Sequence, residues 1–187
     1  DWSSDVCSSD LGFEEVGDNS TLKSNNIDDR YGSSVRLSRD GSTMAVGVPH
    51  DPGGGTKRGQ IRIYQRNGNN WTLVDSINGK VDQDQIGHNA ISLSADGSII
   101  AVGSRRYDNG SKQNAGHVRI FKKNGSSYEP YGSNPELTGN QTGEALGSAV
   151  ALSADGSVLV AGGSLRDNGN KTDAGIVRIY ELGSNNK

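Results

Sequence analysis

The chain carries at positions 86–103 the stretch Ile86-Gly87-His88-Asn89-Ala90-Ile91-Ser92-Leu93-Ser94-Ala95-Asp96-Gly97-Ser98-Ile99-Ile100-Ala101-Val102-Gly103. Closely similar stretches begin at positions 31 and 146, so the three copies start 55 and 60 residues apart. Each copy is followed by a glycine and a short alternating run, at 59–64, 116–121 and 175–180. Self-similarity at a fixed period of this size is the signature of a repeat architecture.

Each repeat predicts four short antiparallel strands. In the first repeat the expected strands are 35–38, 43–48, 60–65 and 71–77. The first pair is joined by Asp40-Gly41 and the second by Asn67-Gly68, both strong hairpin signals because glycine tolerates a positive φ. The second repeat places its fourth strand more loosely, within 128–137. The alternation of apolar and polar residues has the period of a strand, and no amphipathic helix is apparent.

Tandem four-stranded meanders are typical of β-propeller blades. We therefore expect an all-β fold, a β-propeller fragment of about three four-stranded antiparallel blades in an incomplete ring, because closure takes roughly four to eight blades. The expected divisions are 12–30 for the end of a preceding blade and its connection, with a strand remnant at 13–16, then 31–85, 86–145 and 146–187. The last unit is expected to stop after its third strand.

The first eleven residues are interpreted as foreign to the protein. Positions 1–11 resemble a translated sequencing adapter, which is typical of a metagenomic read truncated at its start; a natural Ser-rich linker is the alternative. The full chain has 22 acidic and 19 basic residues. Three of the acidic residues lie within 1–11, so 12–187 contain 19 of each sign. The single cysteine, Cys7, lies in the excluded stretch, so no disulfide framework is expected.

A neutral chain without basic runs argues against a nucleic-acid partner or an anionic membrane surface. No apolar run reaches the roughly 18 residues of a membrane-spanning helix, and no membrane insertion is expected. Six Asn-x-Ser/Thr sequons slightly favour an extracellular setting. They begin at Asn19, Asn70, Asn109, Asn124, Asn140 and Asn170.

The repeat resembles the FG-GAP-type repeat of integrin-α-like propellers across nearly all of 12–187. Apolar–glycine pairs stand where that family places Phe-Gly, namely Tyr31-Gly32, Ile86-Gly87 and Leu146-Gly147. An acidic residue stands two positions before each pair, and Gly47-Val48-Pro49 stands where the family has Gly-Ala-Pro. The acidic residues are Asp29, Asp84 and Glu144. The resemblance implies a seven-bladed propeller in an extracellular or cell-surface adhesion protein.

One departure from the family concerns calcium. Its calcium-binding members carry an Asp-x-Asp-x-Asp-Gly loop, because a hard cation needs several converging oxygen ligands. The second repeat has Ser92, Ser94 and Asp96 in these positions, and the other repeats also carry one carboxylate each, Asp40 or Asp155. A single aspartate in a tight turn usually accepts hydrogen bonds from its own backbone. We therefore expect no metal and no cofactor, with calcium as the alternative.

The predicted binding face consists of the long loops between the second and third strands and of the connections from each fourth strand to the next repeat. Binding residues concentrate on loops held by a rigid scaffold. The long loops run over 50–58, 104–115 and 164–174. The candidate ligand-binding residues are Asp51, Arg105, Arg106, Tyr107, Asp108, Arg166 and Asp167. The alternative interpretation is that the aspartates recur because they form the same Asx-turn in each loop. The strand arginines are expected between blades or in solvent, and they are Arg62, Arg119 and Arg178.

No nucleophile motif, metal-ligand cluster or phosphate-binding loop occurs at diagnostic spacing. The leading hypothesis is a non-catalytic binding or adhesion module that recognises a protein or glycan ligand. One alternative is the propeller portion of a secreted hydrolase or lyase whose catalytic residues lie outside this sequence. Another is an intracellular scaffold, since the repeat also resembles WD40 repeats, although those run about 40–45 residues and carry Trp-Asp.

Overall fold

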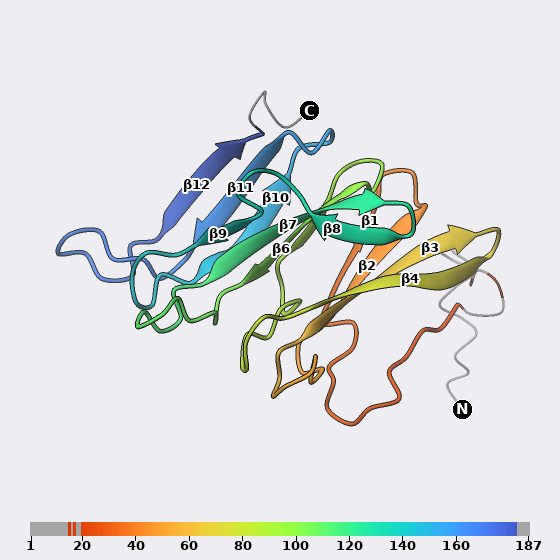
Figure 1. Cartoon of the computed structure of the whole chain (residues 1–187), viewed down its shortest axis with the longest axis horizontal. Coiled ribbons are helices and arrows are strands. Elements are labelled where there is room, and N and C mark those ends of the chain that lie inside the picture. The colour runs from red at the N-terminus through yellow and green to blue at the C-terminus, as the bar shows by residue number, and fades with distance from the viewer. Residues whose placement is uncertain (1–14, 16, 18–19, 183–187) are drawn as a thin grey trace, which may run out of the picture.

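The protein is all-β. The computed structural model describes residues 15, 17 and 20–182, and in these it contains twelve strands in three antiparallel sheets and no helix (Figure 1). Within these residues no helix long and apolar enough to cross a membrane occurs. The predictions made for positions 1–11 lie outside the described residues, as does the strand remnant at 13–16 apart from Glu15.

The first sheet has the strand order β1-β2-β3-β4. Its strands are β1 (Ser34–Leu37), β2 (Thr43–Val48), β3 (Gln60–Asn67) and β4 (Asn70–Asn78). All four were predicted from the sequence, with ends that differ by two residues or fewer. Gly41 and Gly68, the glycines of the two hairpin turns, have φ of 70° and 61°, so the turns need the positive φ that the sequence pattern indicated.

The second sheet repeats this order but divides its last strand. It contains β5 (Ile91–Leu93), β6 (Ile99–Ser104), β7 (His117–Asn124), β8 (Ser127–Pro130) and β9 (Glu136–Thr138). Both β8 and β9 pair with β7, so the single strand expected within 128–137 is wrong in this detail. The break contains Gly132, at a φ of 96°, and Pro135, which has no N–H to donate to a ladder.

The third sheet has the order β10-β11-β12 among the described residues. Its strands are β10 (Leu146–Leu152), β11 (Val158–Gly163) and β12 (Ile176–Glu181). Figure 1 shows the three sheets arranged in sequence order, with the second between the other two. No closed sheet forms within the part of the chain that the structure describes.

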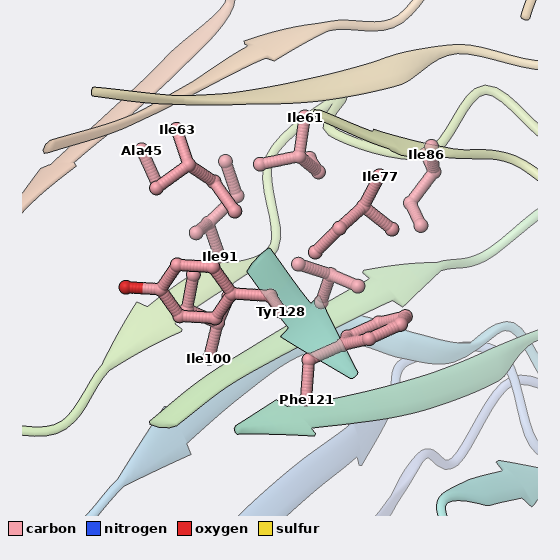
Figure 2. Close-up of a cluster of buried hydrophobic side chains, with 10 residues drawn as sticks. Ala45, Ile61, Ile63, Ile77, Ile86, Ile91, Ile100, Phe121 and Tyr128 are labelled. Atoms are coloured by element: carbon pink, nitrogen blue, oxygen red, sulfur yellow. The ribbon is translucent and has the colours of Figure 1, made fainter. Parts of the chain in front are cut away.

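Apolar side chains fill the two spaces between neighbouring sheets. The cluster between the first and second sheets, drawn in Figure 2, includes Ile61 and Ile63 from β3 and Ile100 from β6. The cluster between the second and third sheets includes Ala101 from β6 and Leu159 from β11. Because successive side chains of a strand point to opposite faces, β6 contributes to both clusters. Each fully buried isoleucine stabilises the packing by about 1.5–3 kcal/mol.

Candidate functional site

The loops predicted to bind a ligand lie together at one end of the sheets. Since neighbouring strands are antiparallel, the β2–β3 loop and the connection leaving β4 emerge at the same end, opposite the tight turns. Loop and connection are bonded to each other. The Ile86 N–H donates to the Arg58 carbonyl oxygen at 3.1 Å, and the Leu146 N–H donates to that of Ala115 at 2.9 Å. We call this end, formed by the loops 50–58, 104–115 and 164–174, the loop face.

Asp51 points into its own loop. Its side chain is 9% exposed, and Oδ2 lies 3.1 Å from a guanidinium nitrogen of Arg62 on β3. The other oxygen accepts a hydrogen bond from the Gly53 N–H at 2.8 Å, which is an Asx-turn. The carboxylate therefore holds the β2–β3 loop against its strand.

Asp108 and Asp167 occupy the equivalent position in the next two loops, and both are exposed. Oδ1 of Asp108 accepts a hydrogen bond from the Asn114 N–H at 2.7 Å, and Oδ1 of Asp167 accepts one from the Asp173 N–H at 2.9 Å. Each bond spans six residues and closes the loop at its base. The two aspartates thus have a role in loop structure that requires no ligand.

Two further candidates anchor their loops to the rest of the molecule. The Tyr107 ring stacks on the His117 ring with centroids 4.1 Å apart and planes 12° from parallel. A guanidinium nitrogen of Arg166 lies 2.7 Å from Oε2 of Glu144, whose side chain is fully buried. Both side chains therefore connect the loop face to buried groups below it.

Arg105 and Arg106 differ from the other candidates. Both are exposed, and neither forms an ion pair with any described residue. They line a small pocket at the junction of the second and third sheets. His88 also lines it, and its Nδ1 atom is buried without a hydrogen-bond partner among the described residues. Burial, together with the charges of the two arginines, lowers the pKa of His88, so this imidazole is neutral at pH 7.

Below the loop face lies an acid–histidine–acid cluster that the sequence did not predict. His117, the first residue of β7, is fully buried. Its Nδ1 lies 3.0 Å from Oε1 of Glu136 on β9, and its Nε2 lies 3.3 Å from Oδ1 of Asp84 in the connection between sheets. The Nε2 contact does not reach the geometry of a hydrogen bond. Lys80 completes the cluster. Its main-chain N–H donates a hydrogen bond to Asp84 Oδ2 at 2.8 Å, and its side-chain ammonium group forms an ion pair with Glu136.

The charges in this cluster support one another. Burial opposes protonation of His117, but the two carboxylates outweigh it and raise the pKa of the imidazole above its ordinary value. The hydrogen bond from His117, reinforced by Lys80, lowers the pKa of Glu136 to about 2. Burial opposes ionisation of Asp84, yet His117 brings its pKa below the ordinary value. The cluster is therefore a buried ionic link between the connection and the second sheet, and its imidazole is closed to solvent.

Ionic contacts of this kind form at the acidic residue that precedes each apolar–glycine pair. Glu144 is the equivalent residue before the third repeat, and its carboxylate pairs with Arg178 of β12 as well as with Arg166. It also accepts hydrogen bonds from two backbone N–H groups of its own connection. Asp29, the first of the series, is 3% exposed. The sequence pattern marked these acids, but it did not indicate that a histidine would partner one and arginines another.

The carboxylates of the tight turns at the opposite end accept hydrogen bonds from their own turns. Oδ1 of Asp96 accepts hydrogen bonds from the Ser94 hydroxyl at 2.7 Å and the Ser98 N–H at 2.9 Å. The serine hydroxyl in turn accepts a bond from the Ile99 N–H. The Ser94 hydroxyl, followed by the Ser98 N–H, lowers the pKa of Asp96. Asp40 and Asp155 make the same contacts in their repeats. Among the described residues, no group of three or more metal-ligating side chains converges on one point.

The fold and this arrangement define an all-β repeat protein whose sheets are joined through buried ionic links and whose longest loops share one face. A scan against protein-family models finds no match to the chain, and a search of curated proteins finds no similar sequence.

Proposed function

We propose that the three sheets are blades of an FG-GAP-type β-propeller and that the protein is a non-catalytic binding or adhesion module, extracellular or at the cell surface. The supporting observation is Arg105-Arg106 at the rim of the pocket on the loop face. In a chain that is neutral over 12–187, two consecutive exposed arginines that form no ion pair with any described residue give a local excess of positive charge.

The other charged candidates on the loop face already have structural partners. Asp51 pairs with Arg62, and Arg166 pairs with Glu144, so a ligand would have to displace these contacts. Arg105 and Arg106 need no such rearrangement. Guanidinium groups recognise carboxylate, sulfate and phosphate oxygens in bidentate geometry. We infer that the ligand is a protein or glycan that presents an anionic group to this pocket.

Further residues of the pocket bear on the charge of its ligand. His88 lines the pocket with an imidazole whose pKa is lowered, so at pH 7 it is neutral and carries no negative charge that would repel an anion. Asp84 also lines the pocket, but its negative charge is compensated by His117, which lies beneath it. The backbone at the rim belongs to the second sheet on one side and to Gly147 and Ser148 of the third on the other.

The test is a binding measurement on immobilised oligosaccharides that carry sulfate groups, uronic acids or no charge. The protein should bind the acidic oligosaccharides, and the R105A/R106A double variant should lose this binding. The matched control is R36A/R39A, which removes the same charge from exposed arginines of the first sheet. Equal loss in both double variants would indicate non-specific charge attraction. Retention of binding by R105A/R106A would contradict the assignment of the pocket.

A further inference from the structure

Neighbouring sheets are joined by the same backbone contact in both places where they meet. The pair Ile86-Gly87 of the second repeat lies on Gly47 and Gly59 of the first sheet. A Cβ atom added to Gly47 would lie 2.0 Å from the Gly87 carbonyl oxygen, and one added to Gly59 would lie 2.5 Å from that of Ile86. Ile86 and Gly59 also form a parallel β-bridge. We call the two glycines of the earlier sheet the glycine seat, because only residues without a side chain permit this approach.

The second sheet has an identical seat. It consists of Gly103 and Gly116, and it receives Leu146-Gly147 of the third repeat. An added Cβ would lie 2.3 Å from the Gly147 carbonyl oxygen at Gly103 and 2.1 Å from the Leu146 carbonyl oxygen at Gly116. The Gly116–Leu146 bridge is again parallel. The contact is therefore a property of the repeat rather than of one junction.

The third sheet carries the same seat, and no described residue covers it. Its equivalent glycines, Gly162 and Gly175, line a hollow together with Ala149 and Val177. The nearest atom to an added Cβ at Gly162 is the Ala149 Cβ at 3.7 Å, an ordinary contact distance. At Gly175 the nearest atom is 3.5 Å away and belongs to the neighbouring loop.

The first repeat carries the other half of this contact, the apolar–glycine pair that docks onto a glycine seat. In Tyr31-Gly32 the glycine has a φ of 85°, matching 85° at Gly87 and 84° at Gly147. An added Cβ at Gly87 would lie 2.9 Å from the Gly47 Cα, and at Gly147 it would lie 3.0 Å from the equivalent Cα. At Gly32 it would meet nothing within 4 Å. This pair has the conformation needed for docking but no glycine seat beneath it among the described residues. Its contacts lie within its own sheet, where the Gly32 N–H donates to the Gly47 carbonyl oxygen and the Tyr31 hydroxyl to that of Tyr64.

The sheet faces around the two unused halves show the same complementarity. Ile61 and Ile63 of β3 are fully buried against the second sheet. Their equivalents on β12, Val177 and Ile179, are 66% and 70% exposed. On the other side, Ile91 of β5 is 1% exposed against the first sheet. Its equivalent on β1, Val35, is 46% exposed. Leu37, two residues further along the same face of β1, is 55% exposed.

A chain of backbone hydrogen bonds between the tight turns is also open at its end. The Arg39 N–H donates to the Ala95 carbonyl oxygen at 2.9 Å, and the Ala95 N–H donates to that of Ala154 at 2.7 Å. The Ala154 N–H makes no backbone hydrogen bond within the residues that the structure describes. If the first sheet of a second copy of the chain followed the third sheet, the Arg39 carbonyl oxygen of that copy would be the next acceptor in this series.

We propose that the chain associates head to tail with a second copy of itself, whose Tyr31-Gly32 occupies the seat formed by Gly162 and Gly175. The repeat identifies the occupant, because the exposed face and the Tyr31-Gly32 pair of the first sheet are the equivalents of those that already dock onto the first and second sheets. Such an interface is heterologous, so it closes into a ring or continues as an open chain. The smallest ring contains two copies and six sheets, within the roughly four to eight of known propellers.

The test uses sedimentation velocity over a range of concentrations with two blocking variants. G162V fills the seat; its Cβ meets no clash within the chain, and valine suits a strand. V35K/L37K charges the opposite face at residues that are already exposed. Each variant alone should be monomeric, with the circular dichroism spectrum of the parent chain. The control T72V, at an exposed position of β4, should assemble like the parent chain.

Mixing the two variants distinguishes this interface from every symmetric one. G162V retains a functional Tyr31-Gly32 end, and V35K/L37K retains a functional seat, so together they should form a one-to-one heterodimer that grows no further. A parent chain that is monomeric at all concentrations would overturn the proposal and would leave the seat to a further repeat of a longer polypeptide. Continued assembly of G162V alone, or no heterodimer on mixing, would also overturn it.

Discussion

Arg119 of β7 donates a hydrogen bond from Nη1 to the main-chain carbonyl oxygen of Asn78, the last residue of β4, over 2.8 Å. Arg178 of β12 repeats this contact on Thr138, the last residue of β9, over 3.3 Å. The third strand of one sheet thus reaches the last strand of the sheet before it. Of the two places expected for these arginines, Arg119 and Arg178 lie at the junctions between sheets, while Arg62 pairs with Asp51 within its own sheet.

Substitution of Arg119 should weaken the junction between the first and second sheets. R119A removes the charged hydrogen bond to Asn78 and the cation–π contact with Phe121, whose ring centroid lies 4.8 Å away. We expect the free energy of unfolding in urea to fall by about 2 kcal/mol. R36A serves as the control, because Arg36 is exposed and bonds only to the neighbouring Val35 carbonyl. An equal effect of both substitutions would argue against the junction role.

Removal of His117 should be more costly. H117A leaves Asp84 and Glu136 without their shared partner in a buried setting, and breaking such a group costs about 3–5 kcal/mol. Chemical denaturation should show the loss. The comparison is H88A, since His88 is only partly buried and its Nδ1 has no described partner. A smaller effect for H117A than for H88A would contradict the ionic link.

The same cluster predicts a dependence of stability on pH. Glu136 has its pKa lowered to about 2, so its contribution is present above the ordinary value of 4.5 and is lost as the pH falls towards 2. His117 has a raised pKa, so its contribution is complete below 6.5 and is lost as the pH rises through the raised value.

The free energy of unfolding attributable to the cluster should therefore be greatest between pH 4.5 and 6.5. The measurement is the difference between the parent chain and H117Q across this range and on both sides of it. That difference should narrow at higher pH, because deprotonated His117 no longer pairs with the carboxylates. A difference that widens above pH 7 would contradict the direction of the pKa change.

Substitution of Glu144, which lies just before the third repeat, should reduce stability more than substitution of an acidic residue within that repeat. E144Q removes the charge that faces both Arg166 and Arg178 at a fully buried position, and we expect a loss of several kcal/mol. The matched substitution D167N keeps an oxygen to accept the Asp173 N–H at an exposed position and should change stability by less than about 0.5 kcal/mol. Similar melting temperatures for the two variants would contradict a stabilising role of Glu144 at the junction between the second and third sheets.

Calcium should not stabilise the tight turns. Each turn offers one carboxylate, and that of Asp96 already accepts hydrogen bonds from Ser94 and Ser98. Calcium binding requires six to eight oxygen ligands, so addition of the ion should leave the melting temperature unchanged. Magnesium at the same ionic strength is the control for general salt effects. A saturable rise with calcium alone, abolished by D96N, would show that the ion binds there.

Most of the secondary structure could be predicted because its signals are local. The hairpins at Gly41 and Gly68 depend on a positive φ that few other residues tolerate, and strand alternation follows from the geometry of the backbone. The division of β8 from β9 was missed, although Gly132 and Pro135 lie between them. The repeat pattern matched this stretch only loosely to a single fourth strand within 128–137, and whether a ladder continues there depends on the partner strand.

The partners of the candidate site could not be predicted in the same way. The recurrence of Asp51, Asp108 and Asp167 allowed either a ligand-binding role or a turn-forming role, and the fold shows that their carboxylates bond within their loops. The sequence also did not indicate that Arg105 and Arg106 form no ion pair with any described residue. A repeat in the sequence shows at which positions a side chain recurs, but it does not show which group each of these side chains contacts.

The sequence by itself determined the all-β class, the period of the repeat and the position of its turns, since each depends on the conformational preferences of residues close in the chain. Tertiary structure alone decided that His117 joins Asp84 to Glu136, and that two glycine seats are filled while a third is open. These contacts join residues that lie 19 or more positions apart, and only the packing of one sheet on the next brings them together.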